Sequence, residues 1–261
     1  MLLAFSDEGT GPVVVLLHGF PLNRSMWDAQ VRALAPAHRV IVPDLRGHGE
    51  SPAPDAVYAM DLMAEDVVEM LDGLGIAEPV VVGGLSMGGY VALALALNHP
   101  DRIRGLVLAD TRAAADSPEA AAKREETAQA VLKTGDLGPL IEGMVPRLFS
   151  RSTFRDRPGL VPPIKAAMEQ TTPAGVAGAL RGMACRPDRR DRLGEIPCPV
   201  LVAVGEDDAI SPPDEARAIA ESLPAGRLAV IPRAGHLAPY ENPDAFNPAL
   251  LDFLRDVPPH A

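Results

Sequence analysis

The stretch GGLSMGG, residues 83–89, follows an apolar run, PVVV (79–82), and precedes a long stretch rich in alanine and leucine. Glycine weakens both strands and helices, so four glycines here indicate a sharp turn where a strand passes into a helix. Such a turn at the carboxyl end of a parallel strand presents a serine hydroxyl above the sheet. Gly84 and Gly88 permit the close approach of the chain that this turn requires. The spacing G-L-S-M-G therefore predicts that Ser86 is a nucleophile.

Two kinds of segment alternate along the rest of the chain. One kind is short, β-branched and continuously apolar, which is typical of buried parallel strands, and the other has the apolar spacing of a helix. This alternation predicts an α/β fold with a doubly wound, mostly parallel sheet. The expected strands are VVVLL (13–17), RVIVP (39–43), PVVVG (79–83), GLVLA (105–109), PVLVAV (199–204) and RLAVI (227–231), with LLAF (2–5) as a short antiparallel edge strand.

One interval, residues 113–195, contains helical patches separated by proline and glycine but no convincing strand. It is expected to form a helical cap, or lid, inserted into a core made of residues 1–112 and 196–261. The interval holds 13 of the 24 Lys and Arg and 11 of the 35 Asp and Glu, a net charge of +2, whereas the remainder carries −13. This bias indicates either a solvated surface that complements an acidic body or a cap over a pocket for anionic or carbonyl-bearing substrates.

Composition narrows the function classes. The 261 residues are 47% hydrophobic and 23% charged, which fits one large globular domain. No apolar run approaches the ~20 residues that span a bilayer, and the start, MLLAFSDEG, is too short for a signal peptide, so a cytoplasmic protein without a membrane partner is expected. The net charge of −11 argues against a nucleic-acid partner. Cys185 and Cys198 lack metal or redox spacing, and neither a metal nor another cofactor is expected.

A serine needs a neighbouring base to attack a carbonyl near neutral pH. His236, in AGHLAPYENP (234–243), follows the last expected strand and precedes the last expected helix. A loop at that point opens on the same edge of the sheet as Ser86, so His236 is the candidate base. The other histidines with ordinary helix-end or tail neighbours, which are expected to be solvated, are His38, His99 and His260.

Six motifs occur in one order along nearly the whole chain: HGFPLN (18–23), PDLRGHGES (43–51), GLSMGG (84–89), ADTRA (109–113), GEDDAISPP (205–213) and AGHLAPYENP (234–243). In that order they resemble the α/β-hydrolase fold family. The resemblance implies that His236 is the base and that Asp208 is the acid that fixes its tautomer. Asp207 is adjacent and is expected to point elsewhere, while some branches of the family place the acid at the position of Asp110.

The resemblance also implies how the remaining motifs serve the site. His18 would shape the oxyanion loop, and His48 would be structural within its turn. Charge on the tetrahedral oxygen needs preset donors, and the N–H of Met87, directly after the nucleophile, is one of them. Pro21 has no N–H, so Phe20 is the expected second donor. The side chains expected to form the substrate pocket are Trp27, Leu140, Met144, Leu148, Phe149 and Met168.

The nucleophile excludes some relatives within this fold. Haloalkane dehalogenases and epoxide hydrolases use a carboxylate at the elbow, and dienelactone hydrolases use a cysteine, whereas this chain has Ser86. HGFPL resembles cofactor-free perhydrolases, and ADTRA followed by an alanine-rich cap resembles small bacterial carboxylesterases and enol-lactonases. The expected function is hydrolysis of short-chain carboxylic esters, with a lactonase or perhydrolase as alternatives. Outside these, a C–C bond hydrolase or lyase and a non-catalytic receptor for a small ligand stay open, as does the oligomeric state.

Overall fold

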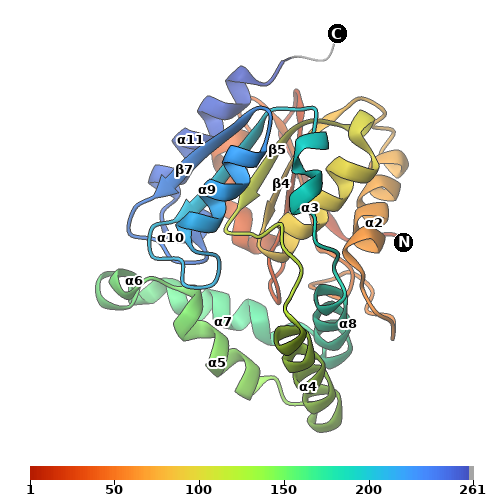
Figure 1. The fold of residues 1–261 in the computed structure, drawn as a ribbon, viewed down its shortest axis with the longest axis vertical. Helices are drawn as coiled ribbons and strands as arrows, with labels where there is room; N and C mark the ends of the chain where they lie inside the picture. The colour runs from red at the N-terminus through yellow and green to blue at the C-terminus, as the bar shows by residue number, and fades with distance from the viewer. Residues whose placement is uncertain (259–261) are drawn as a thin grey trace.

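A computed structural model describes residues 1–258, and His260 lies outside the described residues (Figure 1). A seven-stranded sheet in the order β1-β3-β2-β4-β5-β6-β7 forms its centre. β1 runs antiparallel to β3, and all the other neighbouring strands are parallel. The predicted α/β fold with a mostly parallel sheet is therefore confirmed. The strands are β1 (Phe5–Glu8), β2 (Val13–Leu17), β3 (Arg39–Pro43), β4 (Val80–Leu85), β5 (Ile103–Ala109), β6 (Val200–Gly205) and β7 (Gly226–Ile231).

The edge strand lies further along the chain than the expected segment 2–5. β1 pairs Phe5 with Pro43 and continues into the polar sequence SDE, which is partly or fully exposed. Leu3, 2% exposed, packs in the core ahead of the strand. Leu2, beside it, is 84% exposed, so apolar character did not locate the strand. An edge strand needs only one covered face, and its sequence can therefore be polar.

Helices cover both faces of the sheet (Figure 1). α1 (Asp28–Leu34) and α11 (Pro243–Asp256) lie on one face, while α2 (Met60–Gly73), α3 (Met87–Asn98) and α9 (Pro213–Ser222) lie on the other. The strands alternate between these two apolar layers. In β2, for example, Val13, Val15 and Leu17 join the α2–α3 layer, and Val14 and Leu16 join the α1–α11 layer.

α3 is the helix that begins at the candidate nucleophile. Every residue from Met87 to Ala96 is buried, because α3 packs on the sheet and α2 packs on α3. A helix that is apolar all round is typical of such a buried position. No helix among residues 1–258 is both long enough and apolar enough to cross a membrane.

Between β5 and β6 the chain forms helices and short 3₁₀ turns and no strand, and every residue of this interval is described. Figure 1 shows these helices as a separate layer beyond the end of the sheet. The final 3₁₀ segment, Arg190–Glu195, packs against α9 of the core, and its Leu193 is buried there. The helices of the layer are α4 (Pro118–Thr134), α5 (Gly138–Leu148), α6 (Arg151–Asp156), α7 (Val161–Glu169) and α8 (Pro173–Ala184).

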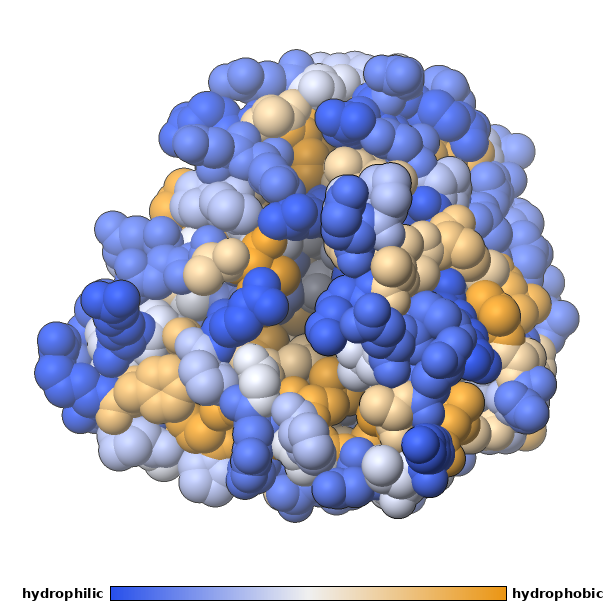
Figure 2. Space-filling view, turned by 60° about the horizontal axis from the view of Figure 1, so that its bottom comes forward, coloured by the Kyte–Doolittle hydropathy of each residue, from blue (hydrophilic) through white to orange (hydrophobic). Residues whose placement is uncertain are grey.

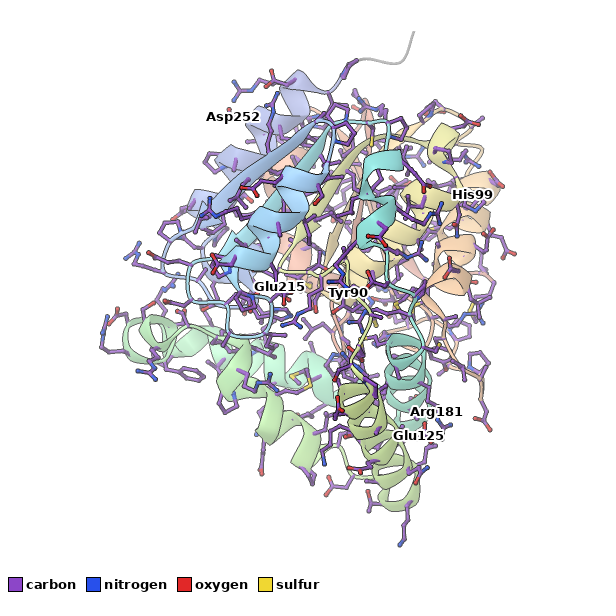
Figure 3. The ribbon with its side chains drawn as sticks, in the orientation of Figure 1. Tyr90, His99, Glu125, Arg181, Glu215 and Asp252 are labelled. Atoms are coloured by element: carbon purple, nitrogen blue, oxygen red, sulfur yellow. The ribbon has the colours of Figure 1, made fainter. Side chains whose placement is uncertain are left out.

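α8 joins this helical layer to the core. A Cβ placed on Gly182 would lie 1.7 Å from the carbonyl oxygen of Tyr58, so α8 approaches the core backbone more closely than any larger residue permits. The N–H of Tyr58 donates to the carbonyl of Gly178 at 3.0 Å. α8 also packs against α4, where Arg181 and Glu125 form an ion pair at 2.9 Å (Figure 3).

Candidate active site

The turn at Ser86 has the conformation that its glycines predict. β4 ends at Leu85 and α3 begins at Met87. Ser86 between them has a φ of +53°, a value that residues other than glycine rarely adopt. Two hydrogen bonds hold the residue there. Its N–H donates to the carbonyl of Ala109 at 2.9 Å, and its carbonyl accepts from the Thr111 hydroxyl at 2.7 Å. The surrounding structure therefore maintains the backbone strain at this serine.

Gly84 and Gly88 are required by close contacts of the main chain. A Cβ on Gly84 would lie 2.1 Å from the carbonyl oxygen of Gly88, and a Cβ on Gly88 would lie 2.3 Å from that of Leu17. Neither distance is compatible with a side chain. The two glycines of G-x-S-x-G are therefore needed for the packing of α3 against β2 and β4, as well as for the turn itself.

A hydrogen-bonded line leads from Ser86 into the protein. Ser86 Oγ lies 2.8 Å from His236 Nε2, and His236 Nδ1 lies 2.9 Å from Asp208 Oδ2. Asp208 Oδ1 also accepts from the N–H groups of Ile210 and Ser211 at 2.8 and 2.9 Å. Both His236 and Asp208 are buried. An ionised carboxylate only accepts hydrogen bonds, so His236 carries its proton on Nδ1 and Nε2 is free to accept the serine proton.

The two alternative acids occupy other positions. Asp207 is exposed, so its side chain points away from the buried His236. Asp110, at the end of β5, is buried and accepts from the N–H groups of Gly205 (2.8 Å) and Ala238 (3.1 Å), one on each oxygen. Burial, and after it the nearby charge of Asp208, raises the pKa of Asp110 well above its usual range. Asp208 is the carboxylate that the structure brings to His236.

His18 fixes the loop after β2 from inside the protein. Burial lowers the pKa of His18 to about 4, so the ring is neutral near pH 7. Leu45 donates its N–H to Nε2 at 2.9 Å, which leaves the proton on Nδ1, from where it is donated to the carbonyl of Gly19 at 2.9 Å. His18 therefore sets the conformation of the backbone just before Phe20.

The two expected oxyanion donors are both close to Ser86: Met87 is the next residue, and the loop that carries Phe20 lies beside it. The N–H of Met87 is in the first turn of α3, where no earlier carbonyl of the helix is available to accept it. A Cβ placed on Gly19 would lie 3.6 Å from Ser86 Cβ, so the loop that carries Phe20 runs beside the nucleophile.

Of the remaining described histidines, His48 is buried, and His38 and His99 are partly buried. Burial lowers the pKa of His48 to about 3, and its ring packs at 5.1 Å, centroid to centroid, from that of His18. His38 is half-buried, and burial also lowers its pKa, so this side chain is less solvated than expected. His99 is also half-buried, and its Nε2 lies 2.7 Å from Glu65 Oε1.

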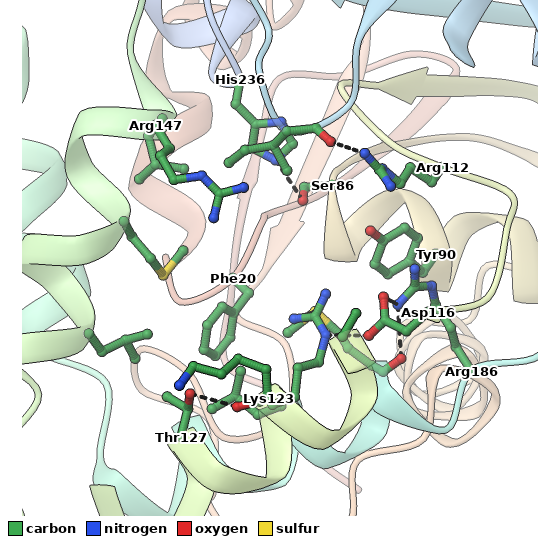
Figure 4. A pocket seen from close by; sticks show the side chains of 18 residues that line it. Phe20, Ser86, Tyr90, Arg112, Asp116, Lys123, Thr127, Arg147, Arg186 and His236 are labelled. Atoms are coloured by element: carbon green, nitrogen blue, oxygen red, sulfur yellow. Dashed lines mark hydrogen bonds and ion pairs between the residues drawn. The ribbon is translucent and has the colours of Figure 1, made fainter. Parts of the chain in front are cut away.

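A cavity of about 360 Å³ opens at Ser86 between the core and the helical layer (Figure 4). Ser86 and His236 lie in its wall, together with Phe20. Of the six side chains that the sequence suggested for the pocket, three line this cavity: Leu140, Met144 and Leu148, all from α5.

The other three suggested side chains, Trp27, Phe149 and Met168, do not line the cavity. Trp27 is fully buried and packs against Phe246 of α11 with ring centroids 6.3 Å apart. Phe149 packs against Phe154 with centroids 5.8 Å apart, and Met168 is fully buried in the same apolar cluster as Trp27. An apolar residue of the core and one of a pocket wall have the same sequence character, and only packing separates them.

Basic side chains were missed by the sequence argument for the pocket. Five of them line the cavity with a single carboxylate, and the face of the molecule seen in Figure 2 is hollowed near its centre and rimmed by hydrophilic side chains. The excess of Arg and Lys in 113–195 was the signal, but it did not say which of them face inward. The charged lining residues are Arg112, Asp116, Lys123, Arg124, Arg147 and Arg186.

Glu241, also missed, connects the His236 loop to the helical layer. Its Oε1 accepts from the N–H of Gly235 at 2.6 Å, and its Oε2 accepts from the N–H of Ser150 at 2.9 Å and the hydroxyl of Thr153 at 2.6 Å. The carboxylate is 1% exposed. The end of α5 is thereby fixed to the loop that carries His236. The single carboxylate in the stretch AGHLAPYENP was the available signal.

Replacing Glu241 with glutamine is expected to destabilise the fold by about 1–3 kcal/mol, because the amide NH₂ would oppose one of these donors inside the protein. Urea unfolding of Glu241→Gln beside Glu221→Gln, an exposed glutamate on α9, measures the difference. Equal unfolding free energies in the two variants would contradict this role of Glu241.

Comparison with known proteins agrees with the fold. Residues 14–249 match the alpha/beta hydrolase family. A solved thermophilic esterase from Thermogutta terrifontis, with malate bound, is 49% identical with a TM-score of 0.96, over 98% of this chain and 93% of that one. The enol-lactonase from Burkholderia xenovorans is 31% identical with a TM-score of 0.90, over 97% and 96% of the two chains. The 3-oxoadipate enol-lactonase 2 of Acinetobacter baylyi is 30% identical over 94% of this chain and 89% of its own. The chain therefore belongs to the α/β-hydrolase family, in the branch that holds esterases and enol-lactonases.

Proposed function

We propose that this hydrolase cleaves short-chain carboxylic esters through an acyl-enzyme intermediate on Ser86. The observation that carries the proposal is the continuous line of hydrogen bonds from Ser86 through His236 to Asp208, with its serine end in the wall of a cavity. The similarity to a solved esterase over nearly the whole chain supports the same reaction.

The first half of the reaction forms the acyl-enzyme. Ser86 Oγ attacks the ester carbonyl while His236 Nε2 takes the hydroxyl proton, and Asp208 stabilises the imidazolium that results. The N–H groups of Met87 and Phe20 would bind the tetrahedral oxyanion, and each such donor contributes a few kcal/mol to the transition state. The intermediate then breaks its bond to the alcohol, which leaves with the proton from His236.

The second half releases the acid. A water molecule gives a proton to His236 Nε2 and attacks the acyl carbon of the Ser86 ester. The second tetrahedral intermediate expels Ser86 Oγ, which recovers its proton from His236. Atoms and charges return to their starting state, and no cofactor is needed for any step.

The cavity favours small acyl groups. At about 360 Å³ it is near the lower end of the range for sites that hold small molecules. Its apolar wall beside the nucleophile comes from Phe20, Leu140, Met144 and Leu148. These side chains would contact the acyl chain and limit its length.

A lactonase is the second candidate, since two relatives over nearly the full chain are enol-lactonases. The same attack on a cyclic ester opens the ring and leaves the alcohol attached to the acyl group.

A substrate panel tests both candidates. It contains p-nitrophenyl esters from acetate to octanoate, an enol-lactone and a meta-cleavage diketone. Turnover of esters or the lactone with burst kinetics supports the proposal, and a higher kcat/KM for the lactone selects the second candidate. Turnover of the diketone alone would replace both with a C–C bond hydrolase, and binding without any turnover would indicate a receptor.

Replacing Leu140 with alanine is expected to shift the preferred acyl chain to a greater length. Loss of its methyl groups changes discrimination between substrates by about 1–3 kcal/mol, so the ratio of kcat/KM for octanoate over butyrate rises about tenfold or more. Leu132→Ala, on an exposed position of α4, is the control and keeps the wild-type profile. If Leu140→Ala also keeps that profile, α5 does not form the acyl pocket.

A further inference from the structure

The lining of the cavity is strongly basic although the protein is acidic. Five of its side chains are Arg or Lys and only one is a carboxylate, so the lining carries a formal charge of +4 in a chain whose net charge is −11. Cations gathered around a cleft with low-dielectric walls concentrate positive potential inside it and attract anions.

Part of this charge is neutralised within the protein. Asp116 binds both Arg124, at 2.5 Å, and Arg186, at 2.7 Å, and Arg186 also lies 4.3 Å above the centre of the Tyr90 ring. Arg112 pairs with Glu215 at 3.0 Å. One carboxylate shared by two guanidinium groups still leaves a positive excess in this part of the wall.

Arg147 is the cation available to a ligand beside the nucleophile. Its side chain is exposed, lines the cavity, and forms no hydrogen bond or ion pair with any residue of 1–258. In Figure 4 the side chain extends from α5 toward Ser86 and His236. Lys123, further along the wall, pairs with Glu126 at 3.1 Å, and both of these side chains are largely exposed. Such an exposed pair contributes little and is readily exchanged for a ligand.

We propose that the substrate of this site carries a carboxylate as well as the ester or lactone bond, and that Arg147 is its principal counter-charge. The inference rests on the proposed hydrolysis at Ser86 and adds the substrate class. A guanidinium presents two parallel N–H groups that match the two oxygens of a carboxylate. Dicarboxylic acid half-esters and lactones with a free carboxylate have this chemistry and are small enough for the cavity.

A matched pair of neutral and anionic esters tests the inference. Monomethyl glutarate carries the carboxylate, and methyl 4-carbamoylbutanoate replaces it with a neutral amide of the same shape. Hydrolysis is followed by pH-stat titration at low ionic strength. Wild-type kcat/KM is expected to be about 5- to 10-fold higher for the half-ester, because the two parallel hydrogen bonds to the guanidinium are weakened by its exposure to solvent.

Two further measurements assign the preference to Arg147. Added salt, up to about 0.5 M, is expected to lower kcat/KM for the half-ester and to leave that for the amide ester nearly constant, since ions screen charge attraction. Arg147→Gln is expected to bring the ratio of the two substrates close to one, and Arg147→Lys to restore part of it. Arg151→Gln removes an exposed arginine four residues away that does not line the cavity, and it keeps the wild-type ratio.

The outcomes separate this inference from the function on which it rests. Hydrolysis of the amide ester at an equal or higher kcat/KM than the half-ester overturns the carboxylate requirement and leaves ester hydrolysis at Ser86 standing. A half-ester preference that survives in Arg147→Gln overturns the assignment to Arg147. If neither ester is hydrolysed and Ser86 does not react with a sulfonyl fluoride, the proposed function itself fails.

Discussion

Ser86→Ala is expected to lower kcat for a short-chain ester by about 10⁴-fold or more, with the fold intact. Without the hydroxyl there is no acyl-enzyme, and the donors and the binding cavity alone supply only a small residual rate over water. Alanine fits at this position because the structure holds the positive φ of +53° through backbone bonds to Ala109 and Thr111 rather than through the side chain. Initial rates with p-nitrophenyl butyrate measure the loss.

Covalent labelling gives the same prediction a second readout. Phenylmethanesulfonyl fluoride is expected to add once, to the peptide that contains Ser86, and not at all to Ser86→Ala. Ser222→Ala, which replaces an exposed serine at the end of α9, is the control and keeps both the activity and the adduct. An adduct on Ser51 or Ser211, or an active Ser86→Ala, would show that another residue is the nucleophile.

The parts of the site that local backbone geometry determines could be predicted from the sequence. G-x-S-x-G requires two glycines because Gly84 and Gly88 meet main-chain atoms within 2.3 Å of a would-be Cβ. The positions of His236 and Asp208 follow from loops at the carboxyl ends of β7 and β6, which neighbour each other in the parallel sheet. A sheet of known strand order brings such loops together whatever their other residues are.

The wall of the cavity could not be predicted in the same way. Its charged residues come from positions 112 to 186, on segments whose mutual placement depends on how α4, α5 and α8 pack. Leu148 lines the cavity and the next residue, Phe149, turns away into the apolar cluster beside Phe154. Nothing in an apolar helical pattern says which of two such neighbours faces a ligand. The same ambiguity placed Trp27 in the pocket, where the structure has it against Phe246.

Hydrogen bonds and backbone contacts hold the helical layer to the site. His236 donates its N–H to the carbonyl of Leu148 at 2.9 Å, and Glu241 binds Ser150 and Gly235. A Cβ on Gly235 would lie 2.7 Å from the nitrogen of Ser150, so the two backbones are in direct contact. These contacts fix the end of α5 to the loop that carries His236.

Asp208→Asn tests how the base is oriented. The carboxamide introduced by this substitution would keep its carbonyl oxygen on the N–H groups of Ile210 and Ser211, because only that oxygen can accept from them. Its NH₂ would then face His236 Nδ1, which must become an acceptor. The proton of His236 would move to Nε2, which could no longer take the proton of Ser86. The expected loss in kcat is about 10⁴-fold. It would come from the changed tautomer of His236, because asparagine has nearly the same shape as aspartate and keeps the packing.

Asp207→Asn is the matched control, since it changes the same residue type at the neighbouring position. The Asp207 side chain is exposed, so its replacement is expected to keep kcat within about tenfold of the wild type. Initial rates on one ester, with thermal unfolding to confirm that both variants are folded, compare the two. Equal losses would mean that the negative charge near the loop matters and not the hydrogen bond to Nδ1. A large loss in Asp208→Asn alone would show that the hydrogen bond between Asp208 and His236 Nδ1 is needed. The two variants remove the same charge at neighbouring positions, so charge alone would not explain the difference.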